Sequence, residues 1–119
     1  MRSINILKKF GQIDKYYNPK IIAELNGHQV KIAKLKGDFI RHNHEDEDEL
    51  FYVLKGKLKM VFDDKTVIIK EGEMLVVPKK VYHKPCADEE VWLMLFEPAS
   101  TLNTGNVLSE LTVLTPEKI

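Results

Sequence analysis

Three histidines and one glutamate are the residues of this chain whose types and spacing could hold a metal ion. His42 and His44 are separated by a single residue, and five consecutive acidic residues, 45–49, follow them. Residues two apart in a strand project to the same side, so the two imidazoles would point in one direction. Imidazole nitrogen is a borderline ligand that suits zinc, iron, nickel and copper. A His-x-His pair alone is weak evidence for a metal site, because such pairs also occur on protein surfaces without binding a metal.

The segment 38–44 is expected to form the strand that carries this pair. Ile40 would then share the face of His42 and His44, and Asn43 would lie on the opposite face. The two histidines would therefore sit beside the apolar core.

Glu49 is the acidic residue that we expect inside the fold. It begins an apolar stretch, 49–55, in which it shares a face with Phe51 and Val53. Burying an unpaired carboxylate costs several kcal/mol, which is comparable to the stability of a whole domain. An inward Glu49 must therefore be protonated, paired with a cation or bound to a metal. The nearby histidines favour a metal, and Glu47, which has the same parity, is the reserve candidate.

A third histidine, His83, lies in the segment VYHKP, residues 81–85, and has the parity of Val81 and Pro85. Cys86 would face away from it, which favours a structural thiol over a zinc ligand. His28 follows an Asn-Gly turn signal and is expected at the surface. The acidic residues 45–48 are expected to form a solvated loop.

Short apolar stretches broken by turn residues are typical of an all-β domain. Helix is scarce: residues 4–10 could form about two turns. The tail, 98–119, contains a short apolar stretch, 108–114, which is either an edge strand or an arm packed on a partner. Strands are predicted over residues 29–37, 49–55, 57–62, 66–70, 74–78, 81–85 and 91–96, with a loop at 87–90.

Length and charge limit the classes of function. The 119 residues suit one domain, and the 18 basic residues balance the 18 acidic ones, so no net field would attract nucleic acid or an anionic membrane. No stretch approaches the roughly 20 apolar residues of a membrane span, and the start of the chain lacks the apolar core of a signal peptide. A single cysteine fits a reducing compartment. We expect a cytoplasmic protein without nucleic-acid or membrane partners.

Several predicted strands are apolar on both faces, notably 50–54, 74–77 and 91–96. A sandwich or small barrel needs only one apolar face per strand. Such strands therefore predict a homodimer in which a second subunit covers the outer face. The alternative is a helix or tail of the same chain lying over that face.

Two groups of residues form sequence motifs in this chain. The first reads Gly37, His42, His44, Glu49 and Gly56, over residues 37–56, and the second, over 72–87, reads Gly72, Pro78 and His83. Together they resemble the two motifs of a single-domain cupin. The gap from Gly37 to His42 is one residue shorter than usual, and the second motif departs from the family pattern at Lys80, where a glycine is typical, and at Ala87, where an asparagine is typical.

The resemblance implies a single cupin domain over 1–119, an all-β antiparallel jelly-roll barrel. It also implies that His42, His44, Glu49 and His83 bind one divalent transition metal, which could be Fe, Mn, Ni, Zn or Cu. Strand parity and the cost of burying Glu49 point to the same four residues. The alternative is a cupin that keeps these residues but stays empty, with its histidines hydrogen-bonded to Glu49.

Three neutral imidazoles and one carboxylate would leave a divalent ion with a net charge of about +1, and an octahedral ion would keep two adjacent positions open. Such a site suits a small polar metabolite that chelates the metal, in an oxygenase or an isomerase. The alternatives are a non-catalytic module that binds a small molecule or metal and, third, a storage or structural cupin. No general base appears beyond the ligands, and Tyr16 and Tyr17 cannot be placed. The expected pocket walls are Ile40, Phe51, Val53, Met60 and one face of 91–96.

Overall fold

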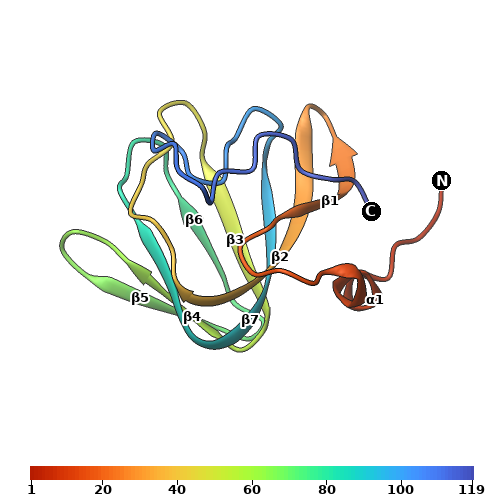
Figure 1. Ribbon diagram of the computed structural model, residues 1–119, viewed down its shortest axis with the longest axis horizontal. Helices are drawn as coiled ribbons and strands as arrows, with labels where there is room; N and C mark the ends of the chain where they lie inside the picture. Colours follow the sequence, from red (N-terminus) through yellow and green to blue (C-terminus); the bar gives the residue numbers. More distant parts are fainter.

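Seven strands form one antiparallel sheet in the computed structural model, which describes residues 1–119. The sheet curls around a core in the manner of a barrel (Figure 1). Its strand order is β1-β2-β7-β3-β6, with β4 joining β7 to β5, and no ladder of hydrogen bonds closes it. The elements are the α-helix α1 (Ile6–Lys9), the 3₁₀-helix η1 (Phe10–Gln12), β1 (Lys20–Leu25), β2 (His28–Asp38), β3 (Glu49–Lys55), β4 (Lys57–Val61), β5 (Thr66–Lys70), β6 (Met74–Val77) and β7 (Lys84–Pro98).

Alternating sequence makes β3 a strand with one buried face, as predicted. Glu49, Phe51 and Val53 are buried, whereas the residues between them are half-buried. Leu58 and Met60 on β4 are also completely buried and pack in the same core. The all-β class and the single short N-terminal helix are both confirmed.

Strand β7 is longer than the sequence predicted, because the expected loop at 87–90 and the predicted strand 91–96 form one continuous strand with residues 84–86. Of the predicted strand 81–85, only the last two residues belong to β7. One edge of β7 pairs with β2, and its other edge pairs with β4 near the start and with β3 near the end. The register with β2 shifts between Leu35 and Gly37, opposite residues 87–91. Asp88 and Glu89, within the expected loop, are exposed.

The predicted strand 38–44 is wrong beyond Asp38, where β2 ends. Residues 39–44 have no regular structure apart from a single bridge between His42 and His83. Phe39, not Ile40, is the buried neighbour of the histidines, and Asn43 is buried too. Buried and exposed residues therefore do not alternate in this segment as they would in a strand, although both histidines still point inward.

The C-terminal tail contains no strand over 108–114. It crosses the upper end of the barrel in the view of Figure 1 and returns beside β1. Within the tail, Thr101 and Thr104 are buried. Asn106 of the tail and Asn43 exchange hydrogen bonds of 3.0 Å, in which the backbone N–H of each residue donates to an oxygen of the other. The tail is thus part of the upper wall of the barrel.

The N-terminal segment covers part of the outer face of the sheet. The ring of Phe10 stacks on Trp92 of β7 with 4.7 Å between centroids. Phe10 packs in a second apolar cluster with Ile13, Ile22 and Ile32. For this region the chain's own helix, rather than a second subunit, buries the outward apolar residues. None of the helices has the length and apolar character needed to cross a membrane.

Candidate metal centre

Three separate segments bring the four predicted ligands to one point. His42 and His44 lie in the irregular segment after β2, Glu49 begins β3, and His83 directly precedes β7. The backbones of His42 and His83 pair through two N–H···O bonds of 3.0 and 2.8 Å. All four side chains are buried, and one ligand atom from each lies within 4.8 Å of the others.

Backbone carbonyls fix the orientation of two imidazole rings. Nδ1 of His42 lies 2.7 Å from the carbonyl oxygen of Ile40, and Nδ1 of His83 lies 2.9 Å from that of Val81. A carbonyl only accepts, so each bond places a proton on Nδ1 and leaves Nε2 with a free lone pair. This is the arrangement by which proteins orient metal-ligating histidines.

The polar atoms at the centre lack hydrogen-bond partners. Nε2 of His44 and Nε2 of His83 lie 2.7 and 3.2 Å from the same oxygen, Oε1 of Glu49. Neither contact has hydrogen-bond geometry, and none of these three atoms has another partner. Buried polar atoms are almost always partnered, so this group of lone pairs fits a bound cation.

The electrostatics of the centre suit a metal. Burial alone would raise the pKa of Glu49, but the neighbouring imidazoles of His44 and His83 hold that pKa well below its usual value. Burial, together with the nearby His83, lowers the pKa of His42 to about 4. Glu49 is therefore charged and His42 neutral near pH 7, which are the forms that bind metals.

The other candidates from the sequence lie outside this centre. Glu47, the reserve ligand, accepts a hydrogen bond from Ser100 at 3.0 Å. The acidic loop before Glu49 is mostly exposed. Cys86 is buried and takes no part in the cluster, and His28 stacks on Phe96 with 5.1 Å between centroids.

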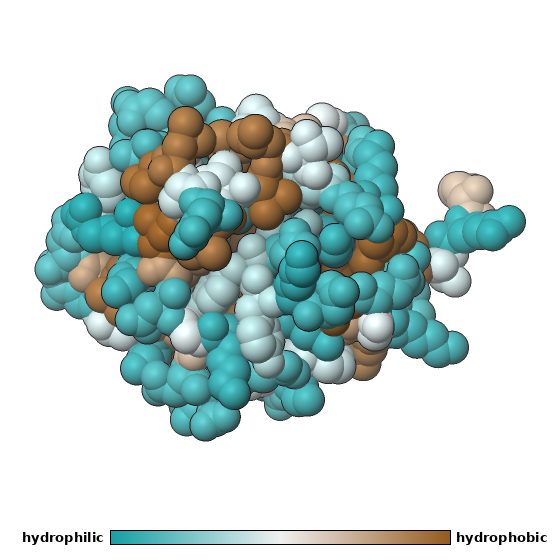
Figure 2. All heavy atoms as spheres, in the orientation of Figure 1, coloured by the Kyte–Doolittle hydropathy of each residue, from teal (hydrophilic) through white to brown (hydrophobic).

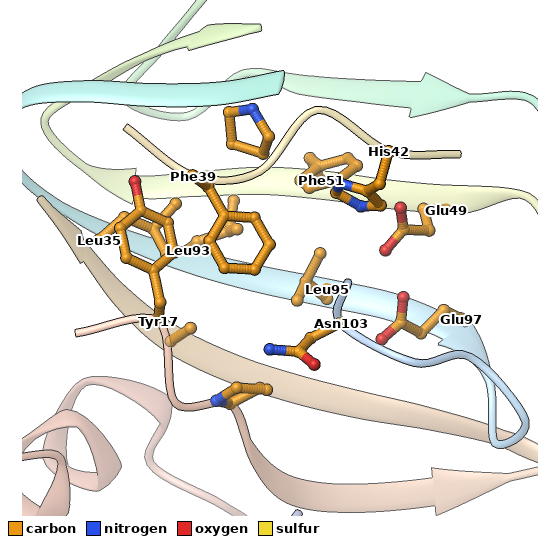
Figure 3. Close-up of a pocket in the computed structure, with 13 residues that line it drawn as sticks. Tyr17, Leu35, Phe39, His42, Glu49, Phe51, Leu93, Leu95, Glu97 and Asn103 are labelled. Atoms are coloured by element: carbon orange, nitrogen blue, oxygen red, sulfur yellow. The ribbon is translucent and has the colours of Figure 1, made fainter. Parts of the chain in front are cut away.

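A small cavity of about 50 Å³ adjoins the centre. Its polar end holds His42, Glu49 and Glu97, and its other end is aromatic, with Tyr17 stacked on Phe39 (Figure 3). Among the predicted walls, Phe51 and the inward face of 91–96 line the cavity, but Ile40, Val53 and Met60 do not. The remaining lining residues are Pro19, Ala33, Leu35, Pro85, Leu93, Leu95 and Asn103.

Sequence reasoning missed a buried ion pair beside the centre. Nζ of Lys31 lies 3.0 Å from Oε1 of Glu97, and both side chains are only 2% exposed. Burial, and then the nearby Glu49 carboxylate, raise the pKa of Glu97 well above its usual value. Strand parity could have found both residues, because Glu97 continues the inward series of 91, 93 and 95, and Lys31 that of 33 and 35.

Tyr17 was missed for a different reason. It lies in the segment between η1 and β1, with a φ of +56° that non-glycine residues rarely adopt. Its hydroxyl donates to the carbonyl oxygen of Gly37, which directs its ring onto Phe39. No local pattern in the sequence signals such a placement.

Two motif positions show why the cupin pattern favours glycine. At Gly56 φ is +87°, and a Cβ would come within 2.7 Å of the carbonyl oxygen of Glu90. Lys80, which stands where the family has glycine, adopts a φ of +70°. That conformation costs a non-glycine residue about 1 kcal/mol or more, so the departure adds local strain at a residue that is not one of the four candidate ligands.

Comparison with known proteins agrees with this architecture. The family model described as "Cupin domain" matches residues 29–96. The crystal structure of a cupin-2 domain containing protein from Shewanella frigidimarina superposes with a TM-score of 0.79 at 43% identity, covering 80% of this chain and 93% of that one.

Two relatives with different names are also similar in sequence to this chain. The chain is 36% identical over 81 residues to the uncharacterized protein YdbB of Bacillus subtilis, covering 67% of this chain and 72% of the relative. It is also 32% identical over 101 residues to the 3-hydroxyanthranilate 3,4-dioxygenase of Xenopus tropicalis. That match covers 79% of this chain but only 36% of the dioxygenase.

Proposed function

The chain belongs to the cupin domain family, and we propose that it is a metal-dependent oxygenase acting on a small metabolite. Its metal would be one divalent transition ion held by His42, His44, Glu49 and His83. The observation that supports this most is the group of buried, unpartnered lone pairs that three segments direct to one point. Hydrophobic side chains in these places would have been less costly to bury.

The chain's own residues would orient the metal and shape its surroundings. The carbonyls of residues 40 and 81 hold two imidazoles with Nε2 inward. Phe39 and Phe51 lie against His42 and His83 respectively and exclude water from them. A metal bound there would supply Lewis acidity and a template for a chelating substrate.

An oxygenase is favoured over an isomerase by the similarity to the amphibian dioxygenase, whose matched region spans most of this chain. A dioxygenase adds both atoms of O₂ to its substrate and needs no separate reductant. A non-catalytic module that binds a small ligand is the second candidate. It is supported by the cavity lining, in which the acid–base groups other than the proposed ligands are Glu97, paired with Lys31, and Tyr17, hydrogen-bonded to Gly37.

Metal content tests the ligand assignment. Replacing His44 with Ala should lower the metal content well below one ion per chain in elemental analysis, because one of four converging ligands is lost. Glu47→Gln is the matched control, since Glu47 is close in sequence but contacts Ser100 instead. Full occupancy in His44→Ala would refute the assignment, and a large loss in Glu47→Gln would move the fourth ligand.

Oxygen uptake tests the reaction class. Iron-loaded protein is mixed with chelating aromatic and enediol compounds in an oxygen electrode, and His44→Ala serves as the negative control. We expect one O₂ consumed per molecule of the compound that is turned over. A metal-loaded protein that binds such compounds without uptake would instead be the binding module.

We also propose a homodimer in the cytoplasm with no nucleic-acid partner. The N-terminal segment covers part of the face that suggested a partner, but other apolar residues stay exposed. Leu108 and Leu114 on the tail are 77% and 72% exposed. Figure 2 shows apolar side chains gathered where the tail crosses the barrel. These residues fit the arm that could pack on a second subunit.

A further inference from the structure

Residues adjacent in sequence to the candidate histidines contact one another outside the metal centre. Arg41 directly precedes His42, and Tyr82 directly precedes His83. The guanidinium of Arg41 lies over the ring of Tyr82, with 4.2 Å from its Cζ to the ring centroid. This contact lies next in sequence to the backbone bridge between His42 and His83. The two histidine-bearing segments are thus joined by side chains as well as by backbone.

A second contact connects Tyr82 to the segment of the first two histidines through the tail. The side-chain amide of Asn106 donates to the Tyr82 hydroxyl at 3.2 Å, and its oxygen accepts from the backbone N–H of Asn43 at 3.0 Å. Asn43 lies between those two histidines. Tyr82 is therefore linked to their segment twice, to Arg41 directly and to Asn43 through the tail.

Arg41 is itself held in place above the tyrosine ring. Its guanidinium donates to both carboxylate oxygens of Asp63, between β4 and β5, in hydrogen bonds of 2.9, 3.0 and 3.2 Å. The two side chains are 52% and 69% exposed, and such a surface ion pair adds little stability by itself. A bidentate pair does, however, fix the orientation of the guanidinium plane. Asp63 therefore helps to keep Arg41 over Tyr82.

The imidazole of His44 depends most on support from outside the centre. Nδ1 of His42 and Nδ1 of His83 each contact a carbonyl oxygen, but Nδ1 of His44 is buried without a partner. The backbone around His44 must therefore position its ring. That backbone is held at residue 43 by Asn106, and at residue 44 by the N–H of Lys80, which donates 2.7 Å to the carbonyl oxygen of His44.

We infer that Tyr82 is a positioning residue of the metal centre: through Arg41 and Asn106 it holds the two histidine-bearing segments together before an ion binds. This inference rests on the proposed function, because it concerns the same metal. Ligands that are already in place lose less freedom on binding. A site that is assembled only part of the time binds with an affinity reduced by that fraction, so loss of Tyr82 weakens metal binding without removing a ligand.

Bound Co²⁺ tests the inference, because its visible bands depend on the ligands around it, and its affinity is measured by competition with a chelator. Tyr82→Leu removes both the ring beneath Arg41 and the hydroxyl. Each contact is worth a factor of about three, so we expect the Co²⁺ affinity to fall about tenfold and the visible bands to change. Tyr82→Phe keeps the ring and should recover part of the loss. Wild-type affinity and bands in Tyr82→Leu would overturn the inference.

Tyr52→Leu is the matched control. Tyr52 is a half-buried tyrosine on β3, the strand that begins with Glu49, and its backbone pairs with Met74 and Met94 instead of a histidine-bearing segment. The same replacement there should lower the stability of the metal-free chain, measured by urea unfolding, and leave the Co²⁺ affinity and bands unaltered. An equal loss of affinity in Tyr52→Leu would overturn the inference, because general destabilisation would then explain both variants.

A double-mutant cycle tests the link between Tyr82 and the tail with milder replacements, so it decides the question even where Tyr82→Leu does not fold. In Asn106→Ala the Tyr82 hydroxyl has already lost its partner, so adding Tyr82→Phe should not lower the Co²⁺ affinity again. Fully additive losses would overturn the link. A wild type that takes up no Co²⁺ would refute the proposed function together with this inference, whereas normal uptake by wild type and variants alike would refute this inference alone.

Discussion

At the scale of single residues, His42 is surrounded by groups that oppose its protonation. It is 2% exposed, and His83 and His44 lie beside it with ring centroids at 4.4 and 4.9 Å. Burial and these two neighbours lower its pKa from 6.5 to about 4, against smaller opposing effects from Ile40 and Glu49. The folded chain therefore keeps the lone pair of Nε2 available well into the acidic range.

This shift predicts a loss of stability in acid for the metal-free protein. Between pH 6.5 and 4 the unfolded chain binds a proton at His42 that the folded chain does not, so the free energy of unfolding falls as the pH falls. The shift from 6.5 to about 4 corresponds to about 3 kcal/mol. We expect urea unfolding, measured at both pH values in the presence of a chelator, to show this loss.

The variant His42→Gln supplies the control, because glutamine does not titrate. The difference in unfolding free energy between wild type and His42→Gln should decrease by about 3 kcal/mol from pH 6.5 to 4, at 1.36 kcal/mol per pKa unit. A difference that stays constant over this range would show that His42 titrates alike in the folded and unfolded chains.

The four candidate ligands could be predicted from the sequence because two local arguments agreed. Parity placed Glu49 on the inward face of its strand, and the cost of its charge required a compensating group. Lys31 and Glu97 obey the same parity but were overlooked. Their closeness depends on the register between β2 and β7, which pairs Lys31 with Leu95. Tyr17 could not have been placed, because only the fold brings it to Phe39.

At the scale of elements, the tail contacts a candidate ligand through a glycine. Gly105 has a φ of +55°, and a Cβ at this position would lie 2.0 Å from the carbonyl oxygen of Asn43 and 2.8 Å from Cδ2 of His42. The close approach lets the tail pack directly on the segment that carries two of the histidines. The tail therefore helps to fix the position of His42.

Replacing Gly105 with Ala should both destabilise the fold and weaken metal binding. Overpacking of this kind costs about 1–3 kcal/mol, and the positive φ adds to it. Chemical unfolding of the metal-free protein and a metal competition assay would measure the two effects. Gly11→Ala is the matched control, because a Cβ there meets nothing within 4 Å. Unaltered metal affinity in Gly105→Ala would show that the tail does not position His42.

Strands in which apolar and polar residues clearly alternate were predicted well. Strands whose formation depends on pairing with a neighbouring strand were not. β3 to β6 lie within a residue or two of their expected bounds. A loop was predicted at 87–90 within β7, but Asp88 and Glu89 are exposed residues of the strand where its register with β2 shifts. β1 was not predicted, since its identity as a strand depends on pairing with β2. The segment 39–44 has no pairing partner beyond one bridge, so it is irregular.

At the scale of the whole molecule, the exposed leucines of the tail bear on the proposed homodimer. Leu108, Leu111 and Leu114 are all exposed, although the tail itself packs against the barrel through Thr101 and Thr104. Met74 is also 57% exposed, but it lies on the edge strand β6. Two surfaces thus carry apolar residues without partners in a single chain.

Sedimentation velocity would distinguish these surfaces. We expect a dimer for the wild type and a shift to monomer when Leu108 and Leu114 are both replaced by Asp, because two charges would be desolvated in the interface. Met74→Glu is the matched control on the other surface and should leave the dimer intact. A wild type that sediments as a monomer at micromolar concentrations would contradict the proposed assembly.

The stack of Phe10 on Trp92 has a practical consequence. Trp92 is the sole tryptophan of the chain, and its ring contacts the N-terminal segment on the outside of the sheet, away from the histidines. Intrinsic fluorescence would therefore signal detachment of the N-terminal segment without any label. Detachment of that segment could then be followed by fluorescence, and ligand binding in the metal-side cavity by calorimetry, as separate signals in one sample.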